Sequence, residues 1–534
     1  MRTVAGNDGS EYLLIGFACR RLDPVVHAGV AAIVQPALSD SMATYEEGDP
    51  HFEALGAYCP EPPASAGGPG PVPAGIPPMP RSDNAPPKHR TVGDKLKSPH
   101  MIERMLQVAG DLSAPAQLRF METVQQLATQ LREVLLGVGW ILRLKRNHAS
   151  LWSSVAGSPI GFVDGGLANL SMLGSAPVAA RVGGYVVTPG MQGADRESFK
   201  VLKYLIDELY AHADGGVYTD SFPDIGALRD AARISIEAAG AVRLLSDRRD
   251  LAWVMLHGAL VNPVSRYTDV MQDGRVRHKF PNFSSTAIGD LLPKDEASRT
   301  GRDSNFVSVY LRQLELMQNS PAVVCGVVER ESSTSSVCKA VLKALHNEDI
   351  RDVLPMPPDE WKESFLKAVN PADDDELEGQ RITDPLLFRC VLEPGEALLP
   401  VPIDRNEIRR APKAWQDVIA EYPRPQVSYL QASEWSAPVR VELFEKDLSR
   451  FPETASLVYH CCLLLPKYAF PVGLDIVDKF AKVPNWMSRP INTYTAVGAL
   501  KRALDDGDSE LFDSLRRMLC GSSREWLLRP GVMR

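Results

Sequence analysis

The 534-residue sequence lacks the signatures of membrane and secreted proteins. It contains no apolar run of about 18 residues, the shortest length that typically spans a bilayer as a helix. The opening segment MRTVAGNDGSEYLLIGF places acidic and polar residues before a short apolar run, which is not the pattern of a secretory signal. We therefore expect a cytoplasmic protein that does not enter the membrane.

Cysteine is sparse and shows no metal-binding pattern. The eight cysteines form no CxxC pair, and Cys461 and Cys462 are adjacent in the chain. This spacing fits neither a zinc site nor a disulfide framework. Reduced, buried thiols in a cytoplasm are the simplest interpretation.

Two common catalytic motifs are absent. There is no GxSxG nucleophile elbow, which argues against an α/β-hydrolase, and no Walker A lysine, so any ATP hydrolysis would belong to a partner. The net charge of −9 argues against a protein whose whole surface binds nucleic acid. It does not exclude a nuclease, because a metal site needs clustered carboxylates and a partner can supply most of the phosphate contacts.

Proline and glycine are concentrated in one stretch. Residues 60–87 contain eleven prolines and the sequence GGPGPVPAG, a composition that supports neither a helix nor a sheet ladder. We expect an extended linker that separates an N-terminal segment from the rest of the chain. That segment is too short for a core of its own, so it should dock on the main body.

The remaining chain has the pattern of an α/β protein. Residues 115–147 carry an amphipathic stripe, which predicts a long helix that packs in the core or mediates contact with a partner. From 159 to 490, strand candidates alternate with helix candidates, which predicts a mixed sheet flanked by helices. The predicted helices are 196–213, 225–246, 304–318 and 335–346. The predicted strands are 159–163, 184–187, 251–256, 322–328, 386–392, 426–430 and 439–443.

Asp164 is the first candidate for chemistry. It follows the strand 159–163 and precedes Gly165 and Gly166. A rigid strand end holds a carboxylate accurately, and many metal-dependent phosphoryl-transfer sites place their first ligand in this way. The two glycines would let the backbone turn tightly and leave room for a ligand. An ordinary Asp-Gly turn is the alternative.

His257 repeats this geometry after the strand 251–256, with Gly258 behind it. Two such strand ends can lie side by side in a mixed sheet, although a single histidine there is more often a hydrogen-bonded structural residue. Glu237 lies at the edge of the apolar face of the helix 225–246. A carboxylate in that position needs a metal, a polar cluster or an arginine as partner, and Arg233 is available one turn earlier.

A late segment offers further carboxylates. Asp475 and Asp478 are three residues apart and share a face of a helix. Asp475 could instead be a helix cap, which leaves Asp478 as the preferred fourth ligand. Tyr468 in the same segment, Glu329 at the end of a strand and Asp384 ahead of the predicted strand 386–392 are second-rank candidates. An exposed salt bridge to a nearby arginine is the alternative for Glu329.

Two charged runs are less informative. The basic residues Arg275, Arg277 and Lys279 could guide a DNA strand through phosphate contacts, with a plain loop as the alternative. The acidic run 373–376 lies between a proline and a glycine and is typical of a solvated loop.

From about 115 to 490, the order of these pieces resembles the NurA nuclease family. The family shows a strand that ends in Asp-Gly, a Gly-aromatic-Val strand, a helical glutamate, a strand that ends in Asp-Gly-x-Leu, and a late segment in which a proline precedes a helix. The matching pieces here are Phe162-Val163-Asp164-Gly165, Gly184-Tyr185-Val186, Glu237, His257-Gly258-Ala259-Leu260 and 470–478. The segments 326–328 and 392–396 are also similar to the family.

The resemblance implies an RNase H-like mixed sheet and a DNA nuclease that depends on Mn²⁺ or Mg²⁺. It implies a homodimer with a HerA-type hexameric ATPase as partner, in DNA-end resection and repair or in anti-phage defence. Asp164, Glu237, His257 and Asp478 would be catalytic, and the three carboxylates among them would bind metal. The expected domains are a docking segment (1–58), a linker (59–98), a helical region (99–150), a nuclease domain (151–490) and a helical tail (491–534).

Two positions depart from the family. Its second aspartate is His257 in this chain, and its late histidine is Asp478. The site keeps four polar groups but exchanges the places of imidazole and carboxylate, and imidazole can still bind a manganese-like ion. The alternative is a decayed site in a scaffold that docks on the translocase ring through its N-terminal segment and the helix 115–147.

Overall fold

The structure is a computed structural model, and it describes residues 2–5, 11–15, 18–21, 114–168, 170, 177–208, 223–264, 268–270, 276–278, 283–297, 305–329, 335–370, 381–403, 413–465 and 468–520. The chain divides into two compact units, Met1–Glu122 and Thr123–Arg534. In the first unit, strands β1 (Arg2–Ala5), β2 (Glu11–Ile15) and β3 (Ala18–Arg21) form an antiparallel sheet. The predicted linker 59–98, the acidic run 373–376, Arg275 and Lys279 lie outside the described residues.

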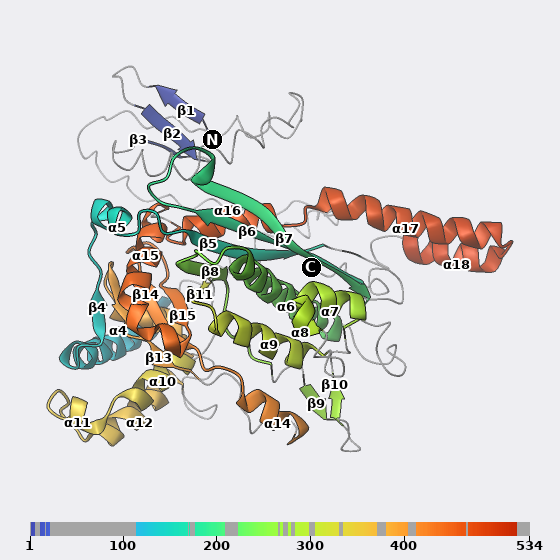
Figure 1. The fold of residues 1–534 in the computed structure, drawn as a ribbon. Helices are drawn as coiled ribbons and strands as arrows, with labels where there is room; N and C mark the ends of the chain where they lie inside the picture. Colours follow the sequence, from blue (N-terminus) through green and yellow to red (C-terminus); the bar gives the residue numbers. More distant parts are fainter. Residues whose placement is uncertain are drawn as a thin grey trace, which may run out of the picture. The chain divides into compact units, whose positions relative to one another are not determined.

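The second unit is built on a ten-stranded mixed sheet (Figure 1). Its strand order is β4-β12-β14-β15-β11-β8-β5-β6-β7, and β13 pairs with β14 beside this path. Neighbours β11 and β8 run parallel, as do β8 and β5, and the other neighbouring pairs are antiparallel. The strands are β4 (Ile141–Arg143), β5 (Ile160–Leu167), β6 (Pro177–Val187), β7 (Glu197–Glu208), β8 (Trp253–His257), β11 (Val323–Val328), β12 (Glu396–Leu398), β13 (Val401–Pro402), β14 (Gln426–Gln431) and β15 (Val439–Leu443).

The three central strands, β5, β8 and β11, are covered on both faces. Val163, Val254 and Val324 are 1% exposed or less, and so is Met255 on the opposite face. Strands with such continuous apolar runs are typical of parallel sheets that lie between two layers of helices. Because the three strands are parallel, they run toward the same edge of the sheet, and the polar residues near that edge are brought together.

Two helical layers cover the sheet. On the face that carries Val163 and Val254, one hydrophobic core is formed with three helices: α6 (Pro223–Asp247), α7 (Ser285–Leu291) and α9 (Phe306–Gln318). The other core places α15 (Phe451–Leu463) and α16 (Val472–Ala481) on the face that carries Phe162 and Met255. Alternation of side chains along each strand therefore supplies both cores.

The remaining elements lie around this centre or extend from it. They are α4 (Ala114–Gly137), α5 (His148–Ser154), α8 (Lys294–Ala297), α10 (Ser336–Ala344), α11 (Asn347–Ile350), α12 (Pro358–Val369), α13 (Asp384–Val391), α14 (Lys413–Ala420), α17 (Asn485–Asp505) and α18 (Ser509–Cys520). A small separate ladder joins β9 (Thr268–Val270) to β10 (Val276–His278), and Arg277 lies in β10. The helices predicted at 225–246, 304–318 and 335–346 are present as α6, α9 and α10.

Two predicted elements were of the wrong type. Residues 196–213 were expected to form a helix, but they contain β7, an edge strand paired with β6. A bulge between Val182 and Gly183 breaks the register, and with it the strict alternation that identifies a strand. The predicted strand 386–392 is helix α13, which has a proline in its first turn, a position that favours helix initiation.

The predicted helix 115–147 was too long. Helix α4 ends at Gly137, and Gly139 follows with a φ of +71°, a left-handed conformation that stops a helix and favours glycine. The apolar residues beyond, which were expected to extend the helix, include β4 at the edge of the large sheet. Lys145 and Arg146 therefore do not close a helix.

The described cysteines fit the expectation of buried thiols. Cys325, Cys338, Cys461 and Cys462 are free and buried, and burial raises the pKa of each of these thiols. Cys390 is free and partly exposed. Within the described ranges, no helix combines the length and the apolar character needed to cross a bilayer.

A buried ion pair ties α4 to the sheet and predicts a stability effect. Arg132 donates to both carboxylate oxygens of Glu396, at 2.6 and 3.1 Å, and the Glu396 side chain is 4% exposed. Arg132→Met should lower the free energy of unfolding by about 3 kcal/mol, because it leaves a charge buried without its main partner. Arg248→Met, which removes an exposed pair with Asp250, should cost less than about 1 kcal/mol in the same denaturant titration.

The same pair gives the effect a pH dependence. Burial would raise the pKa of Glu396, but the hydrogen bond from Arg132 and its charge outweigh burial and leave that pKa lowered. A lowered carboxyl pKa contributes stability at neutral pH that is lost as the pH falls through the folded-state value. The difference between wild type and Arg132→Met should therefore shrink in acid. An equal difference at neutral and acidic pH would contradict this assignment.

Candidate metal centre

Asp164 and His257 meet because β5 and β8 are parallel neighbours. Val163 of β5 pairs with Leu256 of β8, so the next residue of each strand is brought alongside the other. Asp164 is 5% exposed, and its Oδ2 lies 3.0 Å from Nδ1 of His257. Its Oδ1 accepts a hydrogen bond from the amide of Gly165 at 2.8 Å. The sequence-based expectation that these two residues lie side by side is therefore met.

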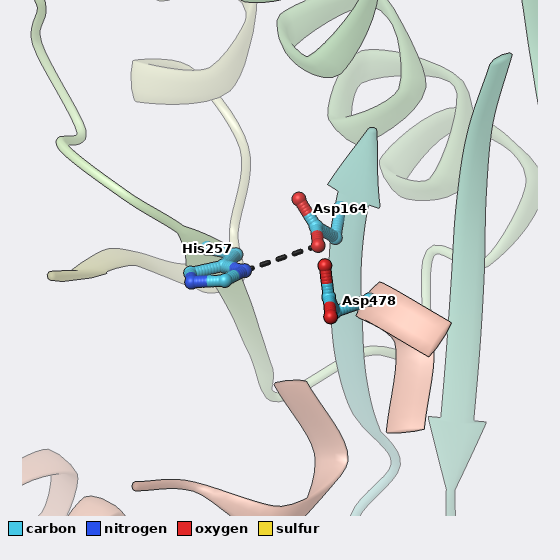
Figure 2. Close-up of side chains that lie close together, drawn as sticks. All are labelled: Asp164, His257 and Asp478. Atoms are coloured by element: carbon cyan, nitrogen blue, oxygen red, sulfur yellow. Dashed lines mark hydrogen bonds and ion pairs between the residues drawn. The ribbon is translucent and has the colours of Figure 1, made fainter. Parts of the chain in front are cut away.

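Asp478 reaches the same point from helix α16. One ligand atom each of Asp164, His257 and Asp478 lies within 4.8 Å of the other two, and among the described residues no other cluster of three potential ligands is found. Figure 2 shows the three side chains pointing toward one another from β5, from the end of β8 and from α16. Two carboxylates and one imidazole thus converge from segments that lie far apart in the sequence.

The two glycines after Asp164 do not form the turn that the sequence predicted. β5 continues through both of them to Leu167. A Cβ on Gly165 would lie 2.6 Å from Cγ of Glu237, and a Cβ on Gly166 would lie 2.6 Å from the carbonyl oxygen of Ala481. The glycines are needed because α6 and α16, which carry the other acidic residues, pack directly against this strand.

Glu237 lies in the same cavity but is held by an arginine. Arg233, four residues earlier on α6, bonds both of its oxygens at 2.9 and 3.0 Å. Burial raises the pKa of Glu237, the charge of Arg233 opposes this and the charge of Asp164 adds to it. The result is a carboxyl group whose pKa is shifted toward neutrality, where it can exchange protons. The arginine partner considered from the sequence is present.

His257 has polar neighbours on both sides of its ring. Burial would lower its pKa, but the hydrogen bond and charge of Asp164 outweigh burial and leave it raised. Nε2 lies 4.0 Å from a carboxylate oxygen of Glu329, which follows β11. The hydroxyl of Tyr468 donates to the other oxygen of Glu329 at 2.6 Å. The ring of Phe470 lies 5.1 Å from the imidazole, centroid to centroid, and helps to fix its orientation.

These groups line one cavity of about 480 Å³. Its walls include two cations, Arg233 and Lys482, beside the acidic residues. Lys482 forms an ion pair with Asp478 one turn earlier, and this hydrogen bond raises the pKa of the lysine. A cavity with clustered carboxylates and flanking cations can hold a metal ion and an anionic group of a substrate together.

Two predicted site residues have other partners. Asp475 lines the cavity, and its carboxylate is paired with Lys479 at 2.6 Å; it is not in the cluster of three. Asp384 does not line this cavity. It begins α13, is fully buried and accepts hydrogen bonds from the amides of Val337 and Cys338 at 2.8 and 3.0 Å. It therefore caps the N-terminus of α10, a role that the predicted strand at 386–392 concealed.

The donor set suits a manganese or magnesium ion. Carboxylate oxygens are the ligands that these ions prefer, and imidazole is a common additional ligand of manganese-like ions. Asp164 is rigid on a central strand, while Asp478 and His257 are held by a packed helix and a strand end. Asp164, His257 and Asp478 would hold the ion, and Glu237 would lie beside it.

No protein-family model matches this chain, and no curated protein sequence matches it. Among solved structures, the chain is similar to the NurA nuclease from Sulfolobus solfataricus at 11% identity and a TM-score of 0.40, over 76% of this chain and 97% of that chain. It is also similar to NurA with manganese, at 8% identity and a TM-score of 0.31, over 64% of this chain and 91% of that chain. A third similar structure is NurA bound to dAMP and manganese, at 13% identity and a TM-score of 0.31, over 72% of this chain and 94% of that chain. These similarities are distant in sequence and in fold, so the chemistry is argued from the residues of this chain.

Proposed function

We propose that this protein is a divalent-metal-dependent deoxyribonuclease of the NurA type. The observation that carries the proposal is the convergence of Asp164, His257 and Asp478 in a cavity that also contains Arg233 and Lys482. Hydrolysis of a phosphodiester needs charge neutralisation at the phosphate and an activated water, and such a cavity can provide both. The order of motifs along the chain, which resembles the NurA family, supports DNA as the substrate.

The sheet topology supports the same assignment. Strands β5, β6 and β7 form an antiparallel meander. Strand β8 then pairs with β5, and β11 pairs with β8, both in parallel, which gives the order β7-β6-β5-β8-β11. We infer an RNase H-like core from this arrangement. In this core, the first and fourth strands along the chain carry Asp164 and His257 at neighbouring positions.

Each polar residue has a role in the proposed reaction. A bound Mn²⁺ or Mg²⁺ would act as a Lewis acid toward the phosphate and would lower the pKa of a bound water. Asp164, His257 and Asp478 would hold the cation. Glu237 lines the same cavity and burial raises its pKa toward neutrality, so we assign it the proton transfer. Arg233 and Lys482 line the cavity and would pair with the charge of the phosphate.

The proposal includes the partners that the family resemblance implies. A HerA-type hexameric ATPase would deliver DNA, and the nuclease would act as a homodimer in end resection or in defence against phage. The net charge of −9 is compatible with this division of labour, because a partner can supply most of the phosphate contacts. The basic residues Arg275, Arg277 and Lys279 remain proposed DNA contacts.

The test is degradation of end-labelled linear DNA by the purified chain with Mn²⁺, with Mg²⁺ or with EDTA. We expect shortening of the DNA with a divalent ion and none with EDTA. If no metal supports cleavage, the assay is repeated with the ATPase partner and ATP. Absence of cleavage under that condition as well would contradict the nuclease proposal and favour a scaffold.

A further inference from the structure

Arg181 holds the C-terminal end of helix α16 through hydrogen bonds. Arg181 lies on β6, where it pairs with Gly166 of β5. Its Nε donates to the carbonyl oxygen of Ala481 at 2.9 Å, and its Nη2 donates to the carbonyl oxygens of Phe480 at 2.8 Å and Lys482 at 2.5 Å. Phe480 and Ala481 end α16 and Lys482 is its C-cap residue, and the carbonyl oxygens at a helix C-terminus have no partner within the helix. The guanidinium group therefore caps the helix.

The strand opposite Arg181 is shaped to receive the same helix end. A Cβ on Gly166 would lie 2.6 Å from the carbonyl oxygen of Ala481 and 2.8 Å from Cα of Lys482. Both are backbone atoms, so any side chain at this position would push the helix away from the strand. We call Gly166 and Arg181 together the α16 socket. Gly166 on β5 leaves space for the end of the helix, and Arg181 on β6 donates hydrogen bonds to it.

The α16 socket bears on the metal centre because the helix that it holds carries Asp478. Phe162, Asp164 and Gly166 alternate along β5 and therefore share one face, and α16 packs on that face. Near the start of the helix, a Cβ on Gly473 would lie 2.5 Å from the ring of Phe162, so the helix touches the strand there as well. Asp478 lies between these two contacts. Both contacts therefore bear on where its carboxylate lies relative to Asp164.

We propose that Arg181 is a positioning residue of the metal centre: it holds the end of α16 in the socket so that Asp478 faces Asp164 and His257. The inference rests on the proposed function, because this alignment matters only if the three residues hold a cation. Arg181 itself does not line the cavity and does not belong to the cluster of three ligands. It therefore acts through Asp478.

This role has a specific signature. Without Arg181, α16 spends part of its time undocked, and a cation binds tightly only to the docked fraction. The apparent Kd then rises by the inverse of that fraction, so a docked fraction of about one tenth gives about a tenfold weaker affinity. A saturating cation selects the docked state, so kcat is nearly restored. Loss of a ligand, in contrast, lowers kcat even at saturation.

The experiment is a titration of the full chain with Mn²⁺, followed by the EPR signal of the free ion, with kcat measured at saturation in parallel. The variants are Arg181→Met, Arg181→Lys and Gly166→Ala. The control is Arg229→Met on α6, which likewise removes a hydrogen bond from an arginine to a backbone carbonyl, here that of Leu170 at 2.8 Å.

We expect the Kd for Mn²⁺ to rise about tenfold in Arg181→Met and in Gly166→Ala, and less in Arg181→Lys, which keeps one donating nitrogen. It should stay unchanged in Arg229→Met, and kcat at saturating Mn²⁺ should stay within about twofold of wild type. Wild-type affinity in a folded Arg181→Met would overturn the inference. If that variant does not fold, wild-type affinity in Gly166→Ala overturns it. Failure of the wild-type chain to bind Mn²⁺ would instead overturn the proposed function.

Discussion

Asp164→Asn is expected to reduce metal-dependent cleavage of DNA by on the order of 10³-fold, which corresponds to about 4 kcal/mol of transition-state stabilisation. Asp164 is the most rigidly held ligand, because it lies on a central strand and its two oxygens contact the Gly165 amide and His257. Asparagine keeps the shape but removes the charge that holds the cation. The measurement is single-turnover cleavage of end-labelled DNA at saturating Mn²⁺.

The fold should survive this change. Asp164 contributes to the raised pKa of Glu237, so loss of its negative charge relieves repulsion in the cavity. Functional carboxylates of this kind often reduce stability, and their removal is tolerated. We expect a melting temperature equal to or above that of the wild type. A large loss of stability together with the loss of activity would contradict a direct role.

Asp384 provides the matched control. It is also a buried aspartate, but its carboxylate caps α10. Asp384→Asn should lower the free energy of unfolding by about 1 kcal/mol or more and leave cleavage per folded molecule unchanged. The two substitutions thus have opposite effects on stability and on activity. If Asp384→Asn abolished cleavage without destabilising the fold, Asp384 would have to be included in the catalytic site.

Asp478→Asn should be the second large effect, with about a 100-fold loss of cleavage that excess Mn²⁺ does not restore. The reason is that Asp478 is one of only three side chains in the described cluster, so its loss leaves two ligands. Asp475→Asn is the control on the same helix. Asp475 is paired with Lys479 outside the cluster, and its substitution should change cleavage little. Equal losses in both variants would indicate a general charge effect.

The exchange of imidazole and carboxylate relative to the NurA pattern can be tested in the same assay. The double variant His257→Asp, Asp478→His presents the same two kinds of donor from exchanged positions. We expect it to bind Mn²⁺ and to cleave better than Asp478→Asn. A double variant as inactive as Asp478→Asn would show that the backbone of this chain has adapted to its own arrangement of ligands.

The two strand residues of the site could be predicted from the sequence because they depend on local pattern. An apolar strand followed by one polar residue and a glycine occurs at Asp164 and at His257, and the structure places both at neighbouring positions of parallel strands. The helix that carries Glu237 was also clear from its periodicity. These features need only the alternation of apolar residues and the rule that parallel strands share an edge.

Other features depend on contacts that no local pattern reveals. Arg181 and the space at Gly166 act together with the end of α16, about 300 residues later in the chain. The hydrogen bond between Glu329 and Tyr468 likewise joins two segments that are distant in the chain. The adjacent glycines Gly165 and Gly166 are a usable signal, but the sequence alone favours a turn there, because it does not show that α6 and α16 pack against this strand.

The wrong element types have a common cause. The residues of β7 place apolar side chains at spacings that a helix also allows, because a bulge in its pairing with β6 shifts the alternation. The run in α13 is too short for periodicity to distinguish a helix from a strand, and the proline in its first turn was the better signal. In both cases the spacing of the apolar residues did not distinguish a helix from a strand.

The metal centre is tested most directly by the position of Mn²⁺ in crystals of the wild-type chain, located by its anomalous scattering. We expect a strong peak bonded to Asp164, His257 and Asp478, at the point where the three side chains converge in Figure 2. The same crystals of Asp164→Asn should lose that peak. No peak in the wild type, or a peak that does not contact these three residues, would contradict the assignment of the metal centre.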